Sequence, residues 1–189
     1  MKKFFSQLIL FVLVLMTAST VFAAKATPEQ RRAELNGMSE QVLERMYKKY
    51  PSSAEAMENA YAYCTISASS IKWGFWGDDH GRGVAVNNRT NERVYVKMHE
   101  GSLGVNLGAK EYDLLFIIAD EAAWKRFISG NIKFGFEASA DATDGVSGGS
   151  YAGATTAAKG VQVYQLDKKG LAVEATLKGG KISRYKTLN

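Results

Sequence analysis

The sequence predicts an α+β domain: an antiparallel β barrel or sandwich with two N-terminal helices and one inserted helix. Apolar residues follow helical spacing up to about residue 62. From Cys64 onward, β-branched and aromatic residues dominate and alternate with polar ones, which is the period of a half-buried strand. Proline is absent after Pro51. Since proline interrupts the interior of a sheet, this absence favours a continuous sheet of roughly eight to ten strands.

Residues 1–23 have the pattern of a secretory signal peptide. Two lysines precede an apolar run at residues 8–16, and small residues follow at Ala23 and Ala24. The run is shorter than the about 20 residues that a membrane-spanning helix needs. We therefore expect cleavage near Ala23 or Ala24 and a periplasmic or secreted protein.

Composition limits the partners of the mature chain. The first 23 residues contain two lysines and no acid, so their removal lowers the net charge from +5 to +3. This weak basicity permits an anionic membrane surface and does not indicate nucleic acid, which usually needs clustered charge. Cys64 is the only cysteine, so the chain forms no internal disulfide. We expect Cys64 to be a small buried residue of the core.

Residues 24–62 are predicted to be helical. Thr27 and Gln30 have the spacing of a capping box, and Pro28 suits the first turn of the helix that follows. This helix is predicted to end before Pro51, and a shorter helix is expected at residues 54–61.

Residues 63–189 are predicted to form the β-rich domain. Asp120 and Gly130 have the residue types that begin and end a helix, which interrupts the strands. The segment 141–160 consists mostly of Gly, Ala, Ser and Thr, so we expect a mobile loop. Hairpin turns are expected at residues 87–91 and 167–170. Strands are expected at residues 71–75, 84–86, 94–98, 103–107, 112–119, 132–136, 161–163 and 171–177.

Four segments together resemble the SYLF-domain family. They are residues 74–84 (GFWGDDHGRGV), 101–109 (GSLGVNLGA), 134–140 (FGFEASA) and 169–179 (KGLAVEATLKG). The resemblance extends from about residue 54 to the C-terminus. Eukaryotic members of this family bind phosphoinositide membranes and regulate cortical actin. The resemblance implies a lipid-binding domain, here in a secreted bacterial member.

Two groups of basic and aromatic residues are candidates for lipid binding. Lys72, Trp73, Trp76 and Arg82 suit a headgroup interface if one tryptophan faces outward, because aromatic rings and cations both gain there. We expect the two tryptophans on opposite faces of one strand, and ordinary sheet packing explains them equally well. On the first helix, Arg31 and Arg32 permit membrane contact, but the acidic residues of that helix favour docking on the sheet.

The sequence predicts no catalytic residue, cofactor or metal site. Asp78, Asp79 and His80 form an acid–histidine cluster, which we interpret as an exposed turn; the spacing of the other histidine, His99, does not make it converge with them. Gly81, Arg82 and Gly83 lack the following helix of a phosphate-binding loop and are interpreted as a turn or the start of a strand.

The leading functional prediction is therefore a periplasmic lipid- or membrane-binding protein without catalytic activity, whose partner is an anionic phospholipid or membrane surface. Two alternatives remain. One is a carrier of a small apolar ligand that uses a barrel cavity. The other is a metal-dependent hydrolase built on the acid–histidine cluster.

Overall fold

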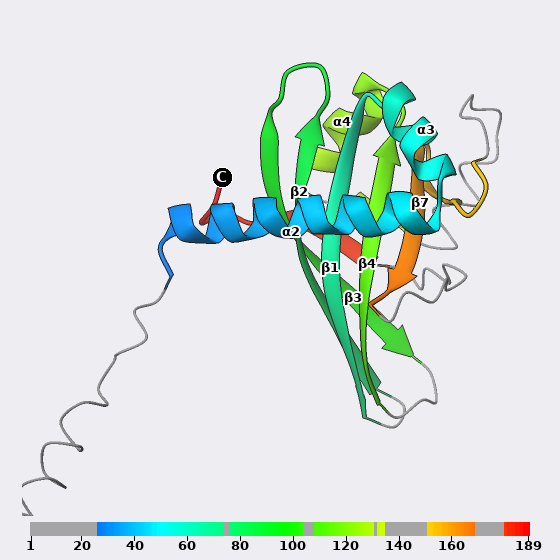
Figure 1. The fold of residues 1–189 in the computed structure, drawn as a ribbon. Coiled ribbons are helices and arrows are strands. Elements are labelled where there is room, and N and C mark those ends of the chain that lie inside the picture. The colour runs from blue at the N-terminus through cyan, green and yellow to red at the C-terminus, as the bar shows by residue number, and fades with distance from the viewer. Residues whose placement is uncertain (1–25, 74–75, 104–107, 131, 135–150, 169–179) are drawn as a thin grey trace, which may run out of the picture.

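A computed structural model describes residues 26–73, 76–103, 108–130, 132–134, 151–168 and 180–189. It confirms the α+β class: two helices come first and one helix interrupts the strands (Figure 1). No helix in these ranges is both long and apolar enough to cross a bilayer. The elements are α2 (Pro28–Lys49), α3 (Ser52–Asn59), β1 (Ala62–Trp73), β2 (Trp76–Asn87), β3 (Arg93–Leu103), β4 (Gly108–Ile118), α4 (Glu121–Ile128), β5 (Ile132–Phe134), β6 (Thr155–Ala158), β7 (Val161–Asp167) and β8 (Gly180–Arg184).

The described strands form one antiparallel sheet of eight strands, in the order β5-β8-β3-β2-β1-β4-β7-β6. Although β5 and β6 are the two edges of this order, they contact each other, so the sheet curls strongly upon itself. A single curled sheet is therefore observed, which is closer to the predicted barrel than to a sandwich of two stacked sheets.

The inner face of the curled sheet holds the largest core. Helix α4 covers this face through Trp124 and Phe127, and Phe116 of β4 packs against Phe127 and Phe134 with ring centroids 5.6 and 5.5 Å away. Cys64 also lies here and is fully buried, as predicted. In the part of the chain that the structure describes, this face is lined with buried apolar side chains. The inner face also includes Ala62, Ile66, Ala68, Ala85, Val94, Val96, Met98, Leu114, Ile118, Val163 and Ile182.

Helix α2 covers part of the outer face and runs across β1, β2 and β4 (Figure 1). Its buried positions Leu35, Val42 and Met46 recur at helical spacing, so one stripe of the helix faces the sheet. Where α2 crosses β1, Thr65 donates a hydrogen bond to Ser39 over 2.7 Å, and both side chains are buried. The predicted docking of this helix on the sheet is confirmed.

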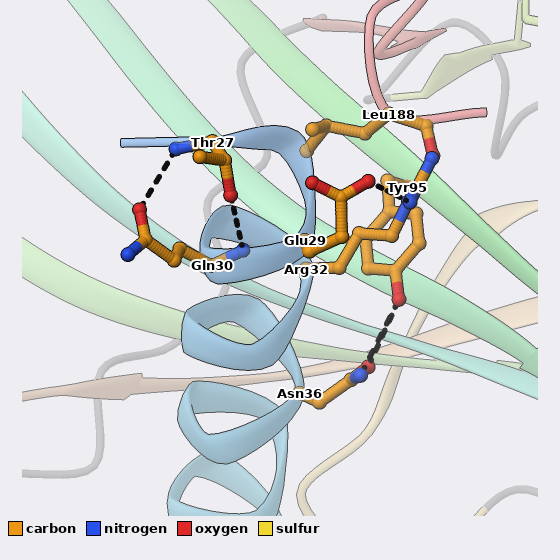
Figure 2. Close-up of polar contacts among 7 residues, drawn as sticks. All are labelled: Thr27, Glu29, Gln30, Arg32, Asn36, Tyr95 and Leu188. Atoms are coloured by element: carbon orange, nitrogen blue, oxygen red, sulfur yellow. Dashed lines mark hydrogen bonds and ion pairs between the residues drawn. The ribbon is translucent and has the colours of Figure 1, made fainter. Parts of the chain in front are cut away.

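Local signals in the sequence explain where the helices begin. Thr27 accepts a hydrogen bond from the Gln30 backbone while the Gln30 side chain accepts one from Thr27, so the predicted capping box is present (Figure 2). Asp120 accepts from the backbone of Ala123 at the start of α4. Helix α3 begins at Ser52, two residues earlier than predicted.

Strands β1 and β2 are longer than predicted. Asp78, Asp79 and His80 lie within β2, so the expectation of an exposed turn is wrong. Trp73 ends β1 and Trp76 begins β2, and the two are paired in the register, so they do not share one strand as expected.

Gly83 shows why this segment is strand rather than turn. A Cβ atom at this position would lie 1.9 Å from the Thr65 carbonyl oxygen and 2.9 Å from Ile66 Cγ1. Such close approach of β1 and β2 requires glycine. Gly81 and Gly83 are buried in β2 on either side of exposed Arg82, which corrects the turn interpretation and leaves no phosphate-binding loop here.

Other predicted boundaries also change. Of the strand expected at residues 103–107, Leu103 ends β3 and residues 104–107 lie outside the described residues. Residues 155–158 form β6 rather than part of a loop. The hairpin turn after Asn87 is confirmed: the Asn87 side chain accepts from the backbones of Arg89 and Thr90. The signal peptide, residues 141–150 of the loop predicted at 141–160, and the strand at 171–177 lie outside the described residues.

Candidate anion-binding groove

A basic groove lies between the start of α2, the end of β8 and the turn after α4. Its volume is about 970 Å³, near the upper end of the range typical of small-molecule sites. No acidic side chain lines it among the described residues. Its potential is therefore positive, which attracts phosphate, carboxylate or sulfate groups. The cationic residues of its lining are Arg31, Lys97, Lys181, Arg184 and Lys186.

Tyr185 organises this groove. Its side chain is buried, its hydroxyl accepts a hydrogen bond from Arg31 Nη1 over 3.3 Å, and the Lys97 ammonium lies 4.0 Å from its ring centroid. The ring faces a cation favourably because its π face is negative. Arg184 is held from the other side, since its Nε donates to the Ile128 carbonyl over 2.6 Å. Three cations are thus positioned by the protein before any ligand arrives.

The C-terminal residues are tied to α2 and β3, which fixes one wall of the groove. Arg32 Nε donates to the Leu188 carbonyl over 2.9 Å and also approaches Glu29 (Figure 2). The Asn189 side chain bonds to both the N–H and the carbonyl of Tyr95, over 2.9 and 2.8 Å. Accordingly, the end of the chain lies beside the start of α2 (Figure 1).

Arg31 and Arg32, which the sequence nominated together, have different positions. Arg31 lines the groove, whereas Arg32 is engaged with the C-terminal residues and Glu29. Both are half-buried. Arg31 is thus a candidate ligand-binding residue, and Arg32 holds the wall in place.

Arg82 lies on the outer face beside a second, smaller hollow of about 480 Å³. It is exposed, and its register partner on β3 is Lys97, which lines the main groove. Arg82 therefore extends the positive surface of the groove across the sheet. This second hollow is lined by Glu34, Leu35, Met38, Ser67, Ala68, Ser69, His80, Arg82, Glu111 and Lys168.

The remaining candidates, Lys72, Trp73 and Trp76, lie at the far end of the β1–β2 hairpin. The helix crosses β1 near Thr65, and at about 3.3 Å per residue the strand runs roughly 26 Å further to reach Trp73. The six nominated residues therefore do not form one cluster. Their side-chain positions at this end lie outside the described part of the structure.

The cations contributed by β3 and by the C-terminal residues were missed in the sequence. Lys181, Arg184 and Lys186 are close in sequence, and a basic count over residues 181–186 would have found them. Lys97 joins them because β3 pairs with β8, which opposes it to Ser183. Such a pairing is not visible in the local sequence.

The described residues show little that resembles catalytic machinery. No three His, Cys, Asp or Glu side chains among them converge on a point. Burial raises the pKa of the Cys64 thiol, which keeps it neutral and poorly nucleophilic. The buried carboxylate of Asp113 is paired with Arg45 of α2, with oxygen–nitrogen distances of 2.7 and 2.9 Å, so it ties the helix to β4.

The fold and the groove define a class of small α+β protein in which a curled antiparallel sheet carries a docked helix and a cationic groove on its outer side. Residues 99–189 match the model of the Ysc84 family, which is described as "Las17-binding protein actin regulator", and the predicted SYLF resemblance is thereby confirmed. The matched region begins within β3 and includes Lys181, Arg184 and Lys186 of the groove.

A curated relative extends the likeness toward the N-terminus. The chain is 29% identical to beta cell expansion factor A of Aeromonas veronii over 157 residues. These residues are 82% of this chain and 58% of the relative, so the chain spans little more than half of that protein.

Proposed function

We propose that the protein is a periplasmic or secreted lipid- or membrane-binding protein without catalytic activity, and that the basic groove binds the anionic headgroups of phospholipids. The observation that carries this proposal is a groove with five cationic side chains and no acid in its described lining. The match of residues 99–189 to the model of a family associated with lipid binding supports the same partner.

The chemistry of a headgroup fits the groove. A phosphodiester offers acceptor oxygens and negative charge, and Arg31 and Arg184 carry guanidinium groups that suit phosphate. The lysines add about 1 kcal/mol each when held near an anionic surface. Because these contacts are largely solvent-exposed, salt screens them over about 10 Å at 0.1 M.

The far end of the β1–β2 hairpin supplies a second element of the proposal. Trp73 and Trp76 are paired at this end, and insertion of either ring into a bilayer would leave binding that resists salt. Binding through the groove alone is abolished at high salt. Salt dependence therefore separates the two modes.

The location outside the cytoplasm rests on the signal-peptide pattern of residues 1–23. An exported bacterial protein does not meet cortical actin, so the proposal takes lipid binding and not actin regulation from the family. Intact-mass measurement of exported protein tests this part. A mass that begins at Ala24 or Lys25 supports it, and retention of residues 1–23 contradicts it.

Co-sedimentation with vesicles that contain phosphatidylglycerol tests the groove. The variant Lys181→Gln/Lys186→Gln removes two cations of the lining, and we expect affinity to fall by about 2 kcal/mol, which is roughly thirtyfold. The matched control is Lys48→Gln/Lys49→Gln, which removes the same charge from the exposed end of α2. An equal loss in both variants, or no binding by the wild type, would contradict the groove as the binding site.

A further inference from the structure

The two histidines of the chain meet on the outer face of the sheet. His80 of β2 and His99 of β3 are register partners, and both are exposed. Their Nδ1 atoms lie 3.1 Å apart, and the rings stand nearly perpendicular, at 87° with centroids 5.1 Å apart. Two ring nitrogens therefore face one point from adjacent strands.

This separation matches the bite of a two-imidazole chelate. A metal ion bound at 2.0–2.1 Å to each of two nitrogens in tetrahedral geometry holds them about 3.3 Å apart. The observed 3.1 Å needs an N–metal–N angle only slightly narrower than tetrahedral. We propose that His80 and His99 together chelate a divalent late transition-metal ion, with Zn²⁺ as the representative ligand.

The proton balance of this step is simple. In the metal-free pair, a hydrogen bond between the two Nδ1 atoms requires that one of them carries a proton and donates it to the other. When that ring changes tautomer, its proton moves to Nε2 and both Nδ1 lone pairs become available. The metal then binds two neutral imidazoles without net release of a proton.

The surroundings carry charges of both signs, so the ligand type defines which ions suit the site. Lys181 is the register partner of His99, and Arg82 follows His80 by two positions on β2, so cationic side chains flank the pair. The hollow that His80 lines also contains the carboxylates of Glu34 and Glu111. Imidazole favours Zn²⁺, Ni²⁺ and Cu²⁺, which form more covalent bonds to nitrogen.

Within the described residues no third His, Cys, Asp or Glu joins the pair. The two histidines are the protein ligands that the described residues supply to this site. The site is independent of the lipid-binding proposal, because neither histidine lines the basic groove.

Zinc titration of the untagged protein tests the inference cleanly, since the chain contains no histidine besides these two. Calorimetry is expected to give one Zn²⁺ per chain. NMR of the imidazole nitrogens is expected to show Zn²⁺ coordination at both Nδ1 atoms and a proton on both Nε2 atoms of the complex. The NMR experiment uses the wild type and does not depend on a variant that folds.

Variants give a second, matched test. His80→Asn and His99→Asn are each expected to weaken Zn²⁺ binding at least about tenfold, because the second ligand of a chelate acts at high effective concentration. Cys64→Ala is the control and retains full affinity, since Cys64 is buried. Lys181→Gln is expected to strengthen binding by removing a neighbouring cation. Unchanged affinity in both histidine variants, no saturable binding, or coordination through Nε2 would overturn the inference.

Discussion

The two faces of the curled sheet are built from opposite kinds of residue. The inner face is mainly apolar in its described part and is covered by α4, with small residues where strands approach closely. The outer face is covered by α2 along one band, and beyond that band it carries Arg82, Lys97 and the two histidines. The strands alternate between the faces, so one set of strands supports both.

This difference separates stability from binding. Burial of apolar area on the inner face provides the main favourable free energy of folding. The cations beyond α2 on the outer face contribute little to stability when exposed, yet they create the potential that attracts a ligand. Substitutions on the two faces should therefore affect different measurements.

The largest expected effect is on the inner face. Phe116→Ala removes a fully buried ring that packs against Phe127 and Phe134, and we expect a loss of about 3–5 kcal/mol in the free energy of unfolding. Chemical denaturation measures it. The outer-face variant Arg82→Ala is the comparison and should change stability by less than about 0.5 kcal/mol. Similar losses of unfolding free energy in the two variants would contradict the claim that the inner face, and not the outer face, provides the stability.

A somewhat smaller effect is expected where α2 joins the sheet. Arg45→Met leaves the fully buried carboxylate of Asp113 without its partner, which we expect to cost about 3 kcal/mol, the low end for a buried pair because Arg45 is partly exposed. The double variant Arg45→Met/Asp113→Leu removes both charges and should be more stable than the single variant. A double variant that is less stable than Arg45→Met would contradict the assignment of the loss to the unpaired Asp113 carboxylate.

Alkaline pH should lower the free energy of unfolding because of the buried Cys64 thiol on the inner face. Burial raises the pKa of this thiol above its ordinary value of 9.0, so the folded protein keeps the proton while the unfolded chain releases it. Stability from this group is present below pH 9.0 and is lost as the pH rises further, by about 1.4 kcal/mol per pH unit. Denaturation curves at pH 8 to 10 should decline less steeply in Cys64→Ala. An identical slope would contradict the assignment to Cys64.

The smallest effect on stability is expected in the groove. Lys181→Gln/Lys186→Gln should change the free energy of unfolding by less than about 0.5 kcal/mol, because both side chains are exposed. Thermal and chemical denaturation check this in the samples used for vesicle binding. A larger loss would mean that weaker lipid binding reflects unfolding.

Local patterns predicted the parts of this fold that depend on neighbours in sequence. The capping box of Thr27 and Gln30, the cap at Asp120 and the turn after Asn87 were all predicted correctly. Residues 76–83 were misinterpreted because glycines and polar residues usually indicate a turn. In the structure Gly81 and Gly83 are buried where β1 and β2 approach closely.

The groove could not be predicted because it joins residues far apart in the chain. Arg31 reaches Tyr185 across more than 150 residues, and Lys97 joins them through the pairing of β3 with β8. The pairing of His80 with His99 could more nearly be predicted from the sequence. Counting outward from the turn, Val86 pairs with Arg93 and the same register places His80 opposite His99. The sequence shows the turn but not how far the two strands continue.

Hydrogen exchange in the presence of anionic vesicles tests most directly whether the outer-face groove is the binding surface. We expect added protection at residues 26–32 and 180–188, which form the groove and its wall, and little change in α4 and the inner-face strand β4. Protection should fall when salt is raised. Protection confined to the end of the β1–β2 hairpin, with residues 180–188 unchanged, would contradict the account.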